Sequence, residues 1–392
     1  MSGPAGRRLL MIEQGGRGGV ADYTRELVAA LAQEGWAVTL ATAADHLYGS
    51  IPGVTVVPVF HYTRGDSPLA RRLRERGLGR AANGLRFLAA VPRLVRLARR
   101  CEIVHSQGWE APQIGVLALC GLRLTGRPVV QTAHGTFTRS TTARGGRRVT
   151  MELTYRLTDR TIVHTEADLE RVAPHLARGR VAVIPHGEYG SLARKGTAST
   201  RAAARTALGV PQDVPATLMY GQLRPDKGLD DLVAAVARVP GLHLLIGGED
   251  LGALSAVRGS LAALEGRVTV LEGFLDMDTT ARLFAAADTV ALPYRQASQS
   301  GVLLLAYGFS RPVVIYPAGG MVEAVLDGET GWICAEPSVP ALAQALAETV
   351  RAGAAECARR GERGRMLADE RFAWPAIARR TAALYEEVLA QR

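Results

Sequence analysis

An arginine and a lysine lie three positions apart in a glycine-bounded stretch, Tyr220 to Gly228, which follows an apolar run and precedes a helix-like segment. Arg224 can bind an anion as a planar fork and Lys227 as a point charge, so both can converge on one phosphate group. Lysine is rare here, because only Lys195 and Lys227 among the 47 Lys and Arg residues are lysines. The stretch therefore predicts a phosphate-binding turn, against the alternative of a solvated turn without a ligand.

Length and composition indicate a globular protein with two cores. The chain has 392 residues, of which 47% are hydrophobic and 21% charged, enough for two domains of ordinary size. No apolar run approaches the ~20 residues of a membrane-spanning helix, and the polar N-terminus is not typical of a secretory signal. We therefore expect a cytoplasmic protein.

The net charge of +10 indicates an acidic partner, such as nucleic acid, lipid headgroups or a phosphorylated substrate. Aromatic residues make up only 5% of the chain and are not interleaved with the basic runs, which disfavours nucleic acid. The four cysteines show no spacing of a zinc or redox motif, so we expect reduced, buried, structural thiols.

The first half opens with a predicted strand at Leu9 to Ile12, a glycine-rich turn and a helix from about Asp22 to Gln33. A second strand follows at Ala37 to Thr42, and this order is the opening of a doubly wound parallel sheet. Gly16, Gly18 and Ala21 even match the spacing of a dinucleotide-binding turn. The match is weak, because the nearest acidic residue, Asp45, lies beyond the second strand. A glycine-rich turn before a helix binds anions without being specific for a dinucleotide.

Two histidines are placed just past short apolar strands, where a parallel sheet borders its ligand crevice. His105 follows Ile103-Val104, and a structural role between loops is an equal alternative for it. His134 follows Val129 to Thr132 and precedes Gly135, which allows close backbone approach, so a functional role is favoured.

The region from Arg64 to Arg100 carries eleven arginines against Asp66 and Glu75, with apolar residues between the cations. It fits an anionic membrane surface, but arginine-rich helices covering one face of a sheet are the favoured interpretation. A polar, unpatterned stretch at Ser191 to Thr200 indicates a linker, after which strands and helices alternate again from Ala216. We predict an N-terminal domain of residues 1–192, to which helix 375–392 returns, and a C-terminal domain of residues 193–374.

Several motifs together resemble glycosyltransferase family 4. They are Gly16-Arg17-Gly18-Gly19-Val20, Thr132-Ala133-His134-Gly135, Val183 to Gly187, Gly221 with Arg224 and Lys227, Ala287-Asp288, Arg311 to Val314, Gly319 to Glu323, and Phe372-Ala373-Trp374. The resemblance implies an α/β protein of the GT-B fold, with two doubly wound Rossmann-like domains facing a central cleft. It also implies a retaining transferase that moves a sugar from a nucleotide diphosphate donor, UDP-linked by preference and GDP-linked as the alternative, to a hydroxyl acceptor.

The resemblance assigns roles by position. Arg224, Lys227 and His134 match the catalytic positions. Donor contacts are expected from Gly18, Gly19, Gly221, Arg224, Lys227, Gln296, Gln299, Ser300, Gly301 and Val302, and acceptor contacts from His105, Gln107 and Trp109. The acceptor would be a natural product, a saccharide or a glycolipid. No cofactor, no nucleic acid and no essential metal are expected, and Asp276-Met277-Asp278 fits a helix N-cap better than a metal site. Peripheral contact with an anionic inner membrane face is left open.

One departure from the family matters. Two glutamates separated by seven positions usually bind the donor sugar and ribose, and the aligned positions here are Ala297 and Leu305. Neither side chain can do the work of a carboxylate. Two alternatives therefore stay open: a catalytically silent nucleotide-sugar binding protein, and an epimerase on the same fold.

Overall fold

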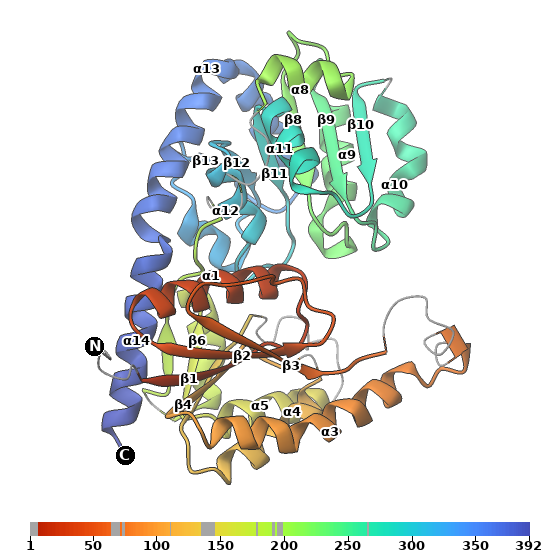
Figure 1. Cartoon of the computed structure of the whole chain (residues 1–392). Coiled ribbons are helices and arrows are strands. Elements are labelled where there is room, and N and C mark those ends of the chain that lie inside the picture. Colours follow the sequence, from red (N-terminus) through yellow and green to blue (C-terminus); the bar gives the residue numbers. More distant parts are fainter. Residues whose placement is uncertain are drawn as a thin grey trace. The chain divides into compact units, whose positions relative to one another are not determined.

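The computed structural model divides into two compact units, each built around a parallel β-sheet (Figure 1). The described residues are 7–63, 71–72, 75–109, 111–134, 146–177, 179–189, 193, 199–264 and 266–392, with only the backbone at 146–148. Unit 1 comprises Met1–Gly187 and Trp374–Arg392, and unit 2 comprises Glu188–Ala373. The sequence predictions at Gly135, Lys195 and most of 137–149 lie outside the described residues.

Unit 1 contains a seven-stranded sheet in the order β3-β2-β1-β4-β5-β6-β7. Its strands are β1 (Arg8–Ile12), β2 (Ala37–Ala43), β3 (Val54–Phe60), β4 (Ile103–Ser106), β5 (Val129–Thr132), β6 (Arg160–Val163) and β7 (Val181–Val183). Its helices are α1 (Gly19–Gln33), α3 (Gly79–Ala98), α4 (Pro112–Arg123), α5 (Gly146–Arg156), α6 (Glu166–Val172), the short 3₁₀ helix η2 (Ala173–His175) and α14 (Trp374–Ala390). All pairings are parallel.

Alternate residues of β1 point to opposite faces of this sheet, and each face is covered by different helices. Leu9 and Met11 pack in one cluster with apolar residues of α1 and α14, whereas Leu10 and Ile12 pack in another with those of α3 and α4. The last helix therefore belongs to the core of unit 1. A side chain at Gly187 would collide with the Trp374 ring, so this glycine allows the start of α14 to lie against the backbone.

Unit 2 contains a six-stranded parallel sheet in the order β10-β9-β8-β11-β12-β13. Its strands are β8 (Ala216–Tyr220), β9 (His243–Gly248), β10 (Val268–Glu272), β11 (Thr289–Leu292), β12 (Val313–Ile315) and β13 (Gly331–Ile333). Its helices are α8 (Arg201–Leu208), α9 (Leu229–Ala237), α10 (Ala253–Leu261), α11 (Met277–Ala286), α12 (Gly301–Gly308), α13 (Val339–Arg371) and the 3₁₀ helices η3 (Pro225–Lys227), η4 (Ala262–Leu264) and η5 (Gly319–Ala324).

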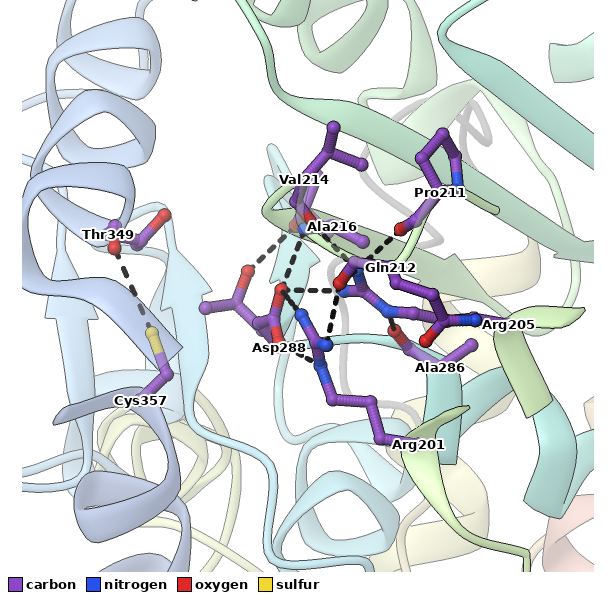
Figure 2. Close-up of polar contacts among 12 residues, drawn as sticks. Arg201, Arg205, Pro211, Gln212, Val214, Ala216, Ala286, Asp288, Thr349 and Cys357 are labelled. Carbon is purple, nitrogen blue, oxygen red and sulfur yellow. Dashed lines mark hydrogen bonds and ion pairs between the residues drawn. The ribbon is translucent and has the colours of Figure 1, made fainter. Parts of the chain in front are cut away.

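Asp288 joins the elements at the N-terminal edge of this second sheet (Figure 2). Its carboxylate accepts hydrogen bonds from Arg201 at 3.0 Å, from the fully buried Arg205 at 2.9 Å and from the backbone N–H of Ala216 at 2.9 Å. Arg205 in turn donates to the backbone carbonyls of Ala286 and Val214. The buried guanidinium and carboxylate therefore satisfy each other, and together they fix α8 and the starts of β8 and β11.

Three sequence expectations differ from the structure. The first helix begins at Gly19 rather than at about Asp22, so its first turn includes a glycine. His105 lies within β4 rather than past its end. Cys101, Cys334 and Cys357 are buried, but Cys120 is exposed because it lies on the outer side of α4. Asp276 does cap α11, accepting a hydrogen bond from the N–H of Thr279.

Candidate functional site

Both units change strand order at the same relative place, and most predicted site residues follow the strands at these points. In unit 1 the reversal lies between β1 and β4, and in unit 2 between β8 and β11. Crevices form at the carboxyl ends of strands where the order reverses.

The turn after β8 is closely packed by glycines. Gly221 has φ of 110°, and a Cβ on Gly248 would lie 1.8 Å from the Gly221 carbonyl oxygen. Gly228 has φ of 71°, and its Cβ would lie 2.1 Å from the Pro293 carbonyl oxygen. These contacts hold the turn after β8 against the ends of β9 and β11. The glycine-bounded stretch is therefore a rigid, packed turn.

Arg224 is held by a neighbour that the sequence reasoning did not use. Its Nε donates to Asp226 at 2.9 Å and its second nitrogen to the other carboxylate oxygen at 3.0 Å. These bonds raise the pKa of the Arg224 guanidinium and lower the pKa of the Asp226 carboxyl. The remaining nitrogen, Nη1, donates to the side-chain oxygen of Gln222 at 3.3 Å. A guanidinium has five N–H donors in a fixed plane, so donors are left for a ligand beside these two neighbours.

Lys227 lies over an aromatic ring. Its ammonium nitrogen is 3.5 Å from the centroid of Tyr294, which follows β11. Tyr294 is buried, and this burial raises the pKa of its phenol to about 12. The sequence reasoning missed Tyr294, although an aromatic residue two positions past an apolar strand was a signal. The ring positions the ammonium by a cation–π contact while leaving its charge intact.

Ser300, Gly301 and Val302 form the start of α12 beside this turn. The Ser300 hydroxyl caps the helix by accepting from the N–H of Leu303 at 3.2 Å. A Cβ on Gly221 would lie 3.3 Å from a Val302 methyl carbon, which places the two segments in contact. The turn and the helix N-terminus thus present two cations and free backbone N–H groups to one region, an arrangement suited to phosphate.

The remaining predicted donor residues differ in their exposure. Gln296 is exposed. Gln299 is partly buried, and its side-chain oxygen has no hydrogen-bond partner among the described residues. Ala297 and Leu305, which stand where the family has glutamates, are both buried in the core of unit 2. In unit 1, Gly18 and Gly19 are exposed at the start of α1, and Gly18 has φ of 78°.

Glu13 organises the glycine-rich turn of unit 1, and the sequence reasoning assigned it no role. This buried carboxylate accepts hydrogen bonds from the N–H groups of Gly15 and Gly16, each at 2.7 Å, and from the Tyr48 hydroxyl at 2.8 Å. The amides of Gly15 and Gly16 are therefore already bound to a carboxylate of the protein. This arrangement disfavours the dinucleotide alternative, in which those amides face a pyrophosphate.

His134 belongs to a buried cluster rather than standing alone at a strand end. Its Nε2 is 2.7 Å from the side-chain oxygen of Gln107, and its Nδ1 is 3.4 Å from Nε2 of His164. Tyr23 of α1 contacts the rings of His134, His164 and His186, with centroids 4.7 to 5.2 Å apart. Burial, followed by the neighbouring histidines, lowers the pKa of His134 well below its ordinary value. His134 is thus held in its neutral form.

The three predicted acceptor residues have inward-facing contacts. His105 is fully buried, with its ring nitrogens against the hydroxyls of Tyr385 and Thr132, and burial lowers its pKa to about 3. Both ring nitrogens of His105 are thus engaged within the protein, which favours the structural alternative for this residue. Gln107 holds His134, and the indole N–H of Trp109 donates to Gln131 at 3.1 Å.

Two further features lie apart from these clusters. A cavity of about 200 Å³ opens beside Arg201, Asp288 and Cys357, at the N-terminal edge of the second sheet (Figure 2). The turn that carries Arg224 and Lys227 lies at the opposite, C-terminal ends of the same strands, so this cavity is not the predicted donor site. Among the described residues, no group of three or more His, Cys, Asp or Glu side chains is placed to hold a metal ion.

Family models match both halves of the chain. The model for Glycosyltransferase Family 4 matches residues 17–187, and the model for Glycosyl transferases group 1 matches residues 214–352. The chain belongs to this glycosyltransferase family.

Similar curated proteins include D-inositol 3-phosphate glycosyltransferases. The one from Mycobacterium avium is 31% identical over 268 residues, covering 64% of this chain and 62% of that protein. The one from Mycobacterium tuberculosis strain F11 is 31% identical over 281 residues, covering 68% and 56%. The chain therefore spans less than two thirds of the length of these relatives.

Solved structures with the same fold align with nearly the whole of this chain. Sucrose-phosphate synthase from Thermosynechococcus elongatus has a TM-score of 0.75 at 22% identity, covering 98% of this chain and 100% of that one. Anabaena HepE in complex with UDP-glucose also has a TM-score of 0.75, at 21% identity, covering 97% and 99%. These neighbours are GT-B glycosyltransferases, which confirms the predicted fold class of two parallel-sheet Rossmann-like domains.

Proposed function

We propose that this family member is a retaining glycosyltransferase that moves a sugar from a nucleotide diphosphate donor to an acceptor hydroxyl. The observation that carries the proposal is the convergence of Arg224, Lys227 and the capped start of α12 at the strand reversal of unit 2. A UDP-sugar is the favoured donor, because HepE, which has the same fold, was solved with UDP-glucose. A GDP-sugar is the alternative donor.

The charge arrangement suits the departure of a diphosphate. As the glycosidic bond breaks, negative charge grows on the leaving phosphate oxygen, and preplaced cations and amide dipoles stabilise that charge. Asp226 and Tyr294 fix the two cations beforehand, so little reorganisation is needed when the charge appears. A metal ion is not required for this work.

Front-face displacement fits this set of residues. The acceptor oxygen attacks the anomeric carbon from the side on which the diphosphate leaves, and the leaving phosphate oxygen takes the acceptor proton. No enzyme carboxylate acts as nucleophile, which agrees with Ala297 and Leu305 at the usual glutamate positions. His134, neutral and held by Gln107, would be a hydrogen-bonding partner for the sugar rather than a charged acid.

The acceptor would be a natural product, a saccharide or a glycolipid. The named relatives act on an inositol phosphate by their printed names, and the chain spans only part of their length. The acceptor therefore has to be identified by assay with a panel of hydroxyl compounds.

Calorimetric titration with UDP and GDP tests the donor site. Wild type should bind one of them, and Arg224→Ala and Lys227→Ala should each weaken binding about 10- to 100-fold, because each loses charge-assisted hydrogen bonds of ~1.5–3 kcal/mol. Arg295→Ala is the matched control, since Arg295 lies beside the turn but is engaged by Asp230 and Asp231. Equal losses in all three variants, or no binding by wild type, would overturn the assignment.

A catalytically silent binding protein is the second candidate, and the buried Ala297 and Leu305 favour it specifically. Such a protein would bind the nucleotide with the same dependence on Lys227 but release no diphosphate when donor and acceptors are supplied together. An epimerase would instead change the donor with no acceptor present. Analysis of the donor by chromatography, and of any product's anomeric configuration by NMR, separates the three.

A further inference from the structure

Three neighbouring helices of unit 1 carry a concentration of exposed apolar side chains. Helices α3, α4 and α5 pack side by side, with α4 in the centre (Figure 1). Of the twelve exposed large hydrophobic side chains among the described residues, six lie on these helices, immediately before α3 or immediately after α4: Leu78, Leu85, Leu117, Leu124, Val149 and Leu153. Single exposed leucines need no explanation, but half of the total on one layer of helices indicates a surface with a partner.

The outer side of α4 has no charged residue along most of its length. Gln113, Leu117, Cys120 and Leu124 are exposed, and they recur at intervals of three and four residues. This spacing puts them on one side of the helix. Leu117 is 54% and Leu124 84% exposed. Figure 1 places α4 between α3 and α5, so this apolar stripe is the middle of the surface.

Cations border the stripe on both sides. On α3, the exposed Leu85 and Ala89 are followed by the exposed Arg93 and Arg96. On α5, the exposed Val149 and Leu153 are followed by the exposed Arg156. We call the exposed residues of these three helices the α3–α5 face.

Acidic side chains are almost absent from this face. Neither α3 nor α4 contains Asp or Glu. The one acidic residue of α5, Glu152, is paired with His175 at 3.1 Å. Arg123, the last residue of α4, is paired with Asp159 at 2.9 Å. Within the part of the chain that the structure describes, no ion pair engages Arg93, Arg96, Arg99 or Arg100. Helix α13 differs, because its arginines pair with glutamates one turn away, as Arg365 does with Glu362 and Arg359 with Glu356.

We propose that the α3–α5 face docks on the surface of an anionic phospholipid bilayer. Apolar side chains in the middle enter the boundary between headgroups and acyl chains, and the bordering arginines contact the lipid phosphates. No helix among the described residues is long and apolar enough to cross a membrane, so this contact lies on the surface. A second copy of the chain is a poorer partner, because two such faces would bring unpaired cations together. The proposal does not rest on the donor site.

Sedimentation with lipid vesicles tests the proposal without using activity. Wild type should sediment with vesicles of phosphatidylcholine and phosphatidylglycerol, should stay in solution with pure phosphatidylcholine, and should be released by salt. Arg93→Glu/Arg96→Glu should weaken binding at least about 25-fold, given ~1 kcal/mol for each basic residue near an anionic surface. The matched control is Arg238→Glu/Arg351→Glu, which makes the same change in net charge on unit 2 and should bind as wild type.

Leu117→Glu/Leu124→Glu tests the apolar stripe, and Met366→Glu, at an exposed position of α13, is its control. We expect at least tenfold weaker vesicle binding for the leucine variant, with an unchanged melting temperature because both sites are exposed. Failure of wild type to bind anionic vesicles at low salt would overturn the proposal. So would equal weakening by the α3–α5 and control variants. A wild-type dimer that Leu117→Glu/Leu124→Glu separates, with no vesicle binding, would assign the face to a second copy instead.

Discussion

The two units share one topology at their strand reversals but differ in the charge of the first turn. In unit 1, the turn after β1 is built on an anion, because Glu13 holds the N–H groups of Gly15 and Gly16 from within the protein. In unit 2, the turn after β8 carries Arg224 and Lys227. The same order of strand, turn and helix can therefore be built around an internal carboxylate or can carry two cations. What differs is whether the protein supplies the negative charge itself.

Gly248, which lies at the end of β9 against the second turn, and Gly18 of the first turn differ in packing, and this predicts the largest effect. Gly248→Ala would put a methyl carbon 1.8 Å from the Gly221 carbonyl oxygen, at a φ of 142°. We expect a loss of about 3 kcal/mol or more in the free energy of unfolding of unit 2. Gly18→Ala in unit 1 meets no atom within 4 Å and should cost only ~1–2 kcal/mol for its positive φ. Urea titration of both variants measures the difference, and similar losses would contradict it.

The buried carboxylate under the first turn predicts the next effect. Glu13→Ala should destabilise unit 1 by about 2–3 kcal/mol, because it leaves the N–H groups of Gly15 and Gly16 and the Tyr48 hydroxyl without their acceptor. Glu249→Ala removes an exposed carboxylate just past β9 and should change the free energy of unfolding by less than ~0.5 kcal/mol. Thermal melts of the two variants compare them. An unchanged melting temperature of Glu13→Ala would show that the hydrogen bonds of Glu13 do not stabilise the turn.

Histidine content separates the units by their response to acid. Unit 1 holds every histidine except His243, and burial lowers the pKa of His105 and His186 to about 3 and lowers those of His134 and His164. A depressed pKa means that the unfolded chain binds more protons. The stabilisation is therefore complete above about pH 6.5 and is lost as the pH falls toward 3, by up to ~1.4 kcal/mol per pH unit for each histidine.

Tryptophan fluorescence can follow this loss, because Trp36, Trp109 and Trp374 lie in unit 1 and only Trp332 lies in unit 2. For most of the fluorescence change, the urea midpoint should be lower at pH 5.5 than at pH 7.5. The groups that face the cluster are Tyr23, Tyr385 and Asp168, and of these Asp168 raises the pKa of His164. Equal midpoints at the two pH values would mean that the buried histidines do not make the stability of unit 1 depend on pH in this range.

The smallest predicted effect belongs to Arg17, the one cation within the first turn. It contacts the backbone oxygen and the carboxylate of Asp45 at the surface. Arg17→Ala should change the free energy of unfolding by less than ~0.5 kcal/mol and should leave nucleoside diphosphate binding within about twofold of wild type. Calorimetric titration beside Lys227→Ala makes the comparison. A loss as large as that of Lys227→Ala would place a phosphate contact in unit 1.

Sequence patterns predicted most of the fold because strand, turn and helix signals are local. Alternating apolar strands and helices indicated two parallel sheets, and Arg224 with Lys227 indicated the phosphate-type turn. The side-chain partners were not predictable in the same way. Asp226 lies within the motif, yet nothing in the spacing shows that its carboxylate turns back to the guanidinium. Tyr294 lies 67 positions from Lys227 in the chain and meets it only because β8 and β11 are neighbours.

His134 illustrates the same limit. Its position past a strand was evident, but burial, followed by His164, His186 and His105, lowers its pKa. Those histidines come from three other segments of the chain. The apolar stripe of α4 was also hidden. Its segment appeared in the sequence as a short apolar run, and only packing between α3 and α5 shows that Leu117, Cys120 and Leu124 remain outside.

The sequence by itself determined the elements, their order, the family and the pair of cations, because these follow from short-range backbone preferences and from residue types at fixed spacing. Tertiary structure alone decided which charges are neutralised and which stay available. Glu13 accepts hydrogen bonds from the amides of its own turn, and Arg224 donates to Asp226. Arg93 and Arg96 of the α3–α5 face have no ion-pair partner among the described residues. The physical reason is that the energy of a charge depends on burial and on partners within a few ångströms, and folding brings those partners from distant parts of the chain.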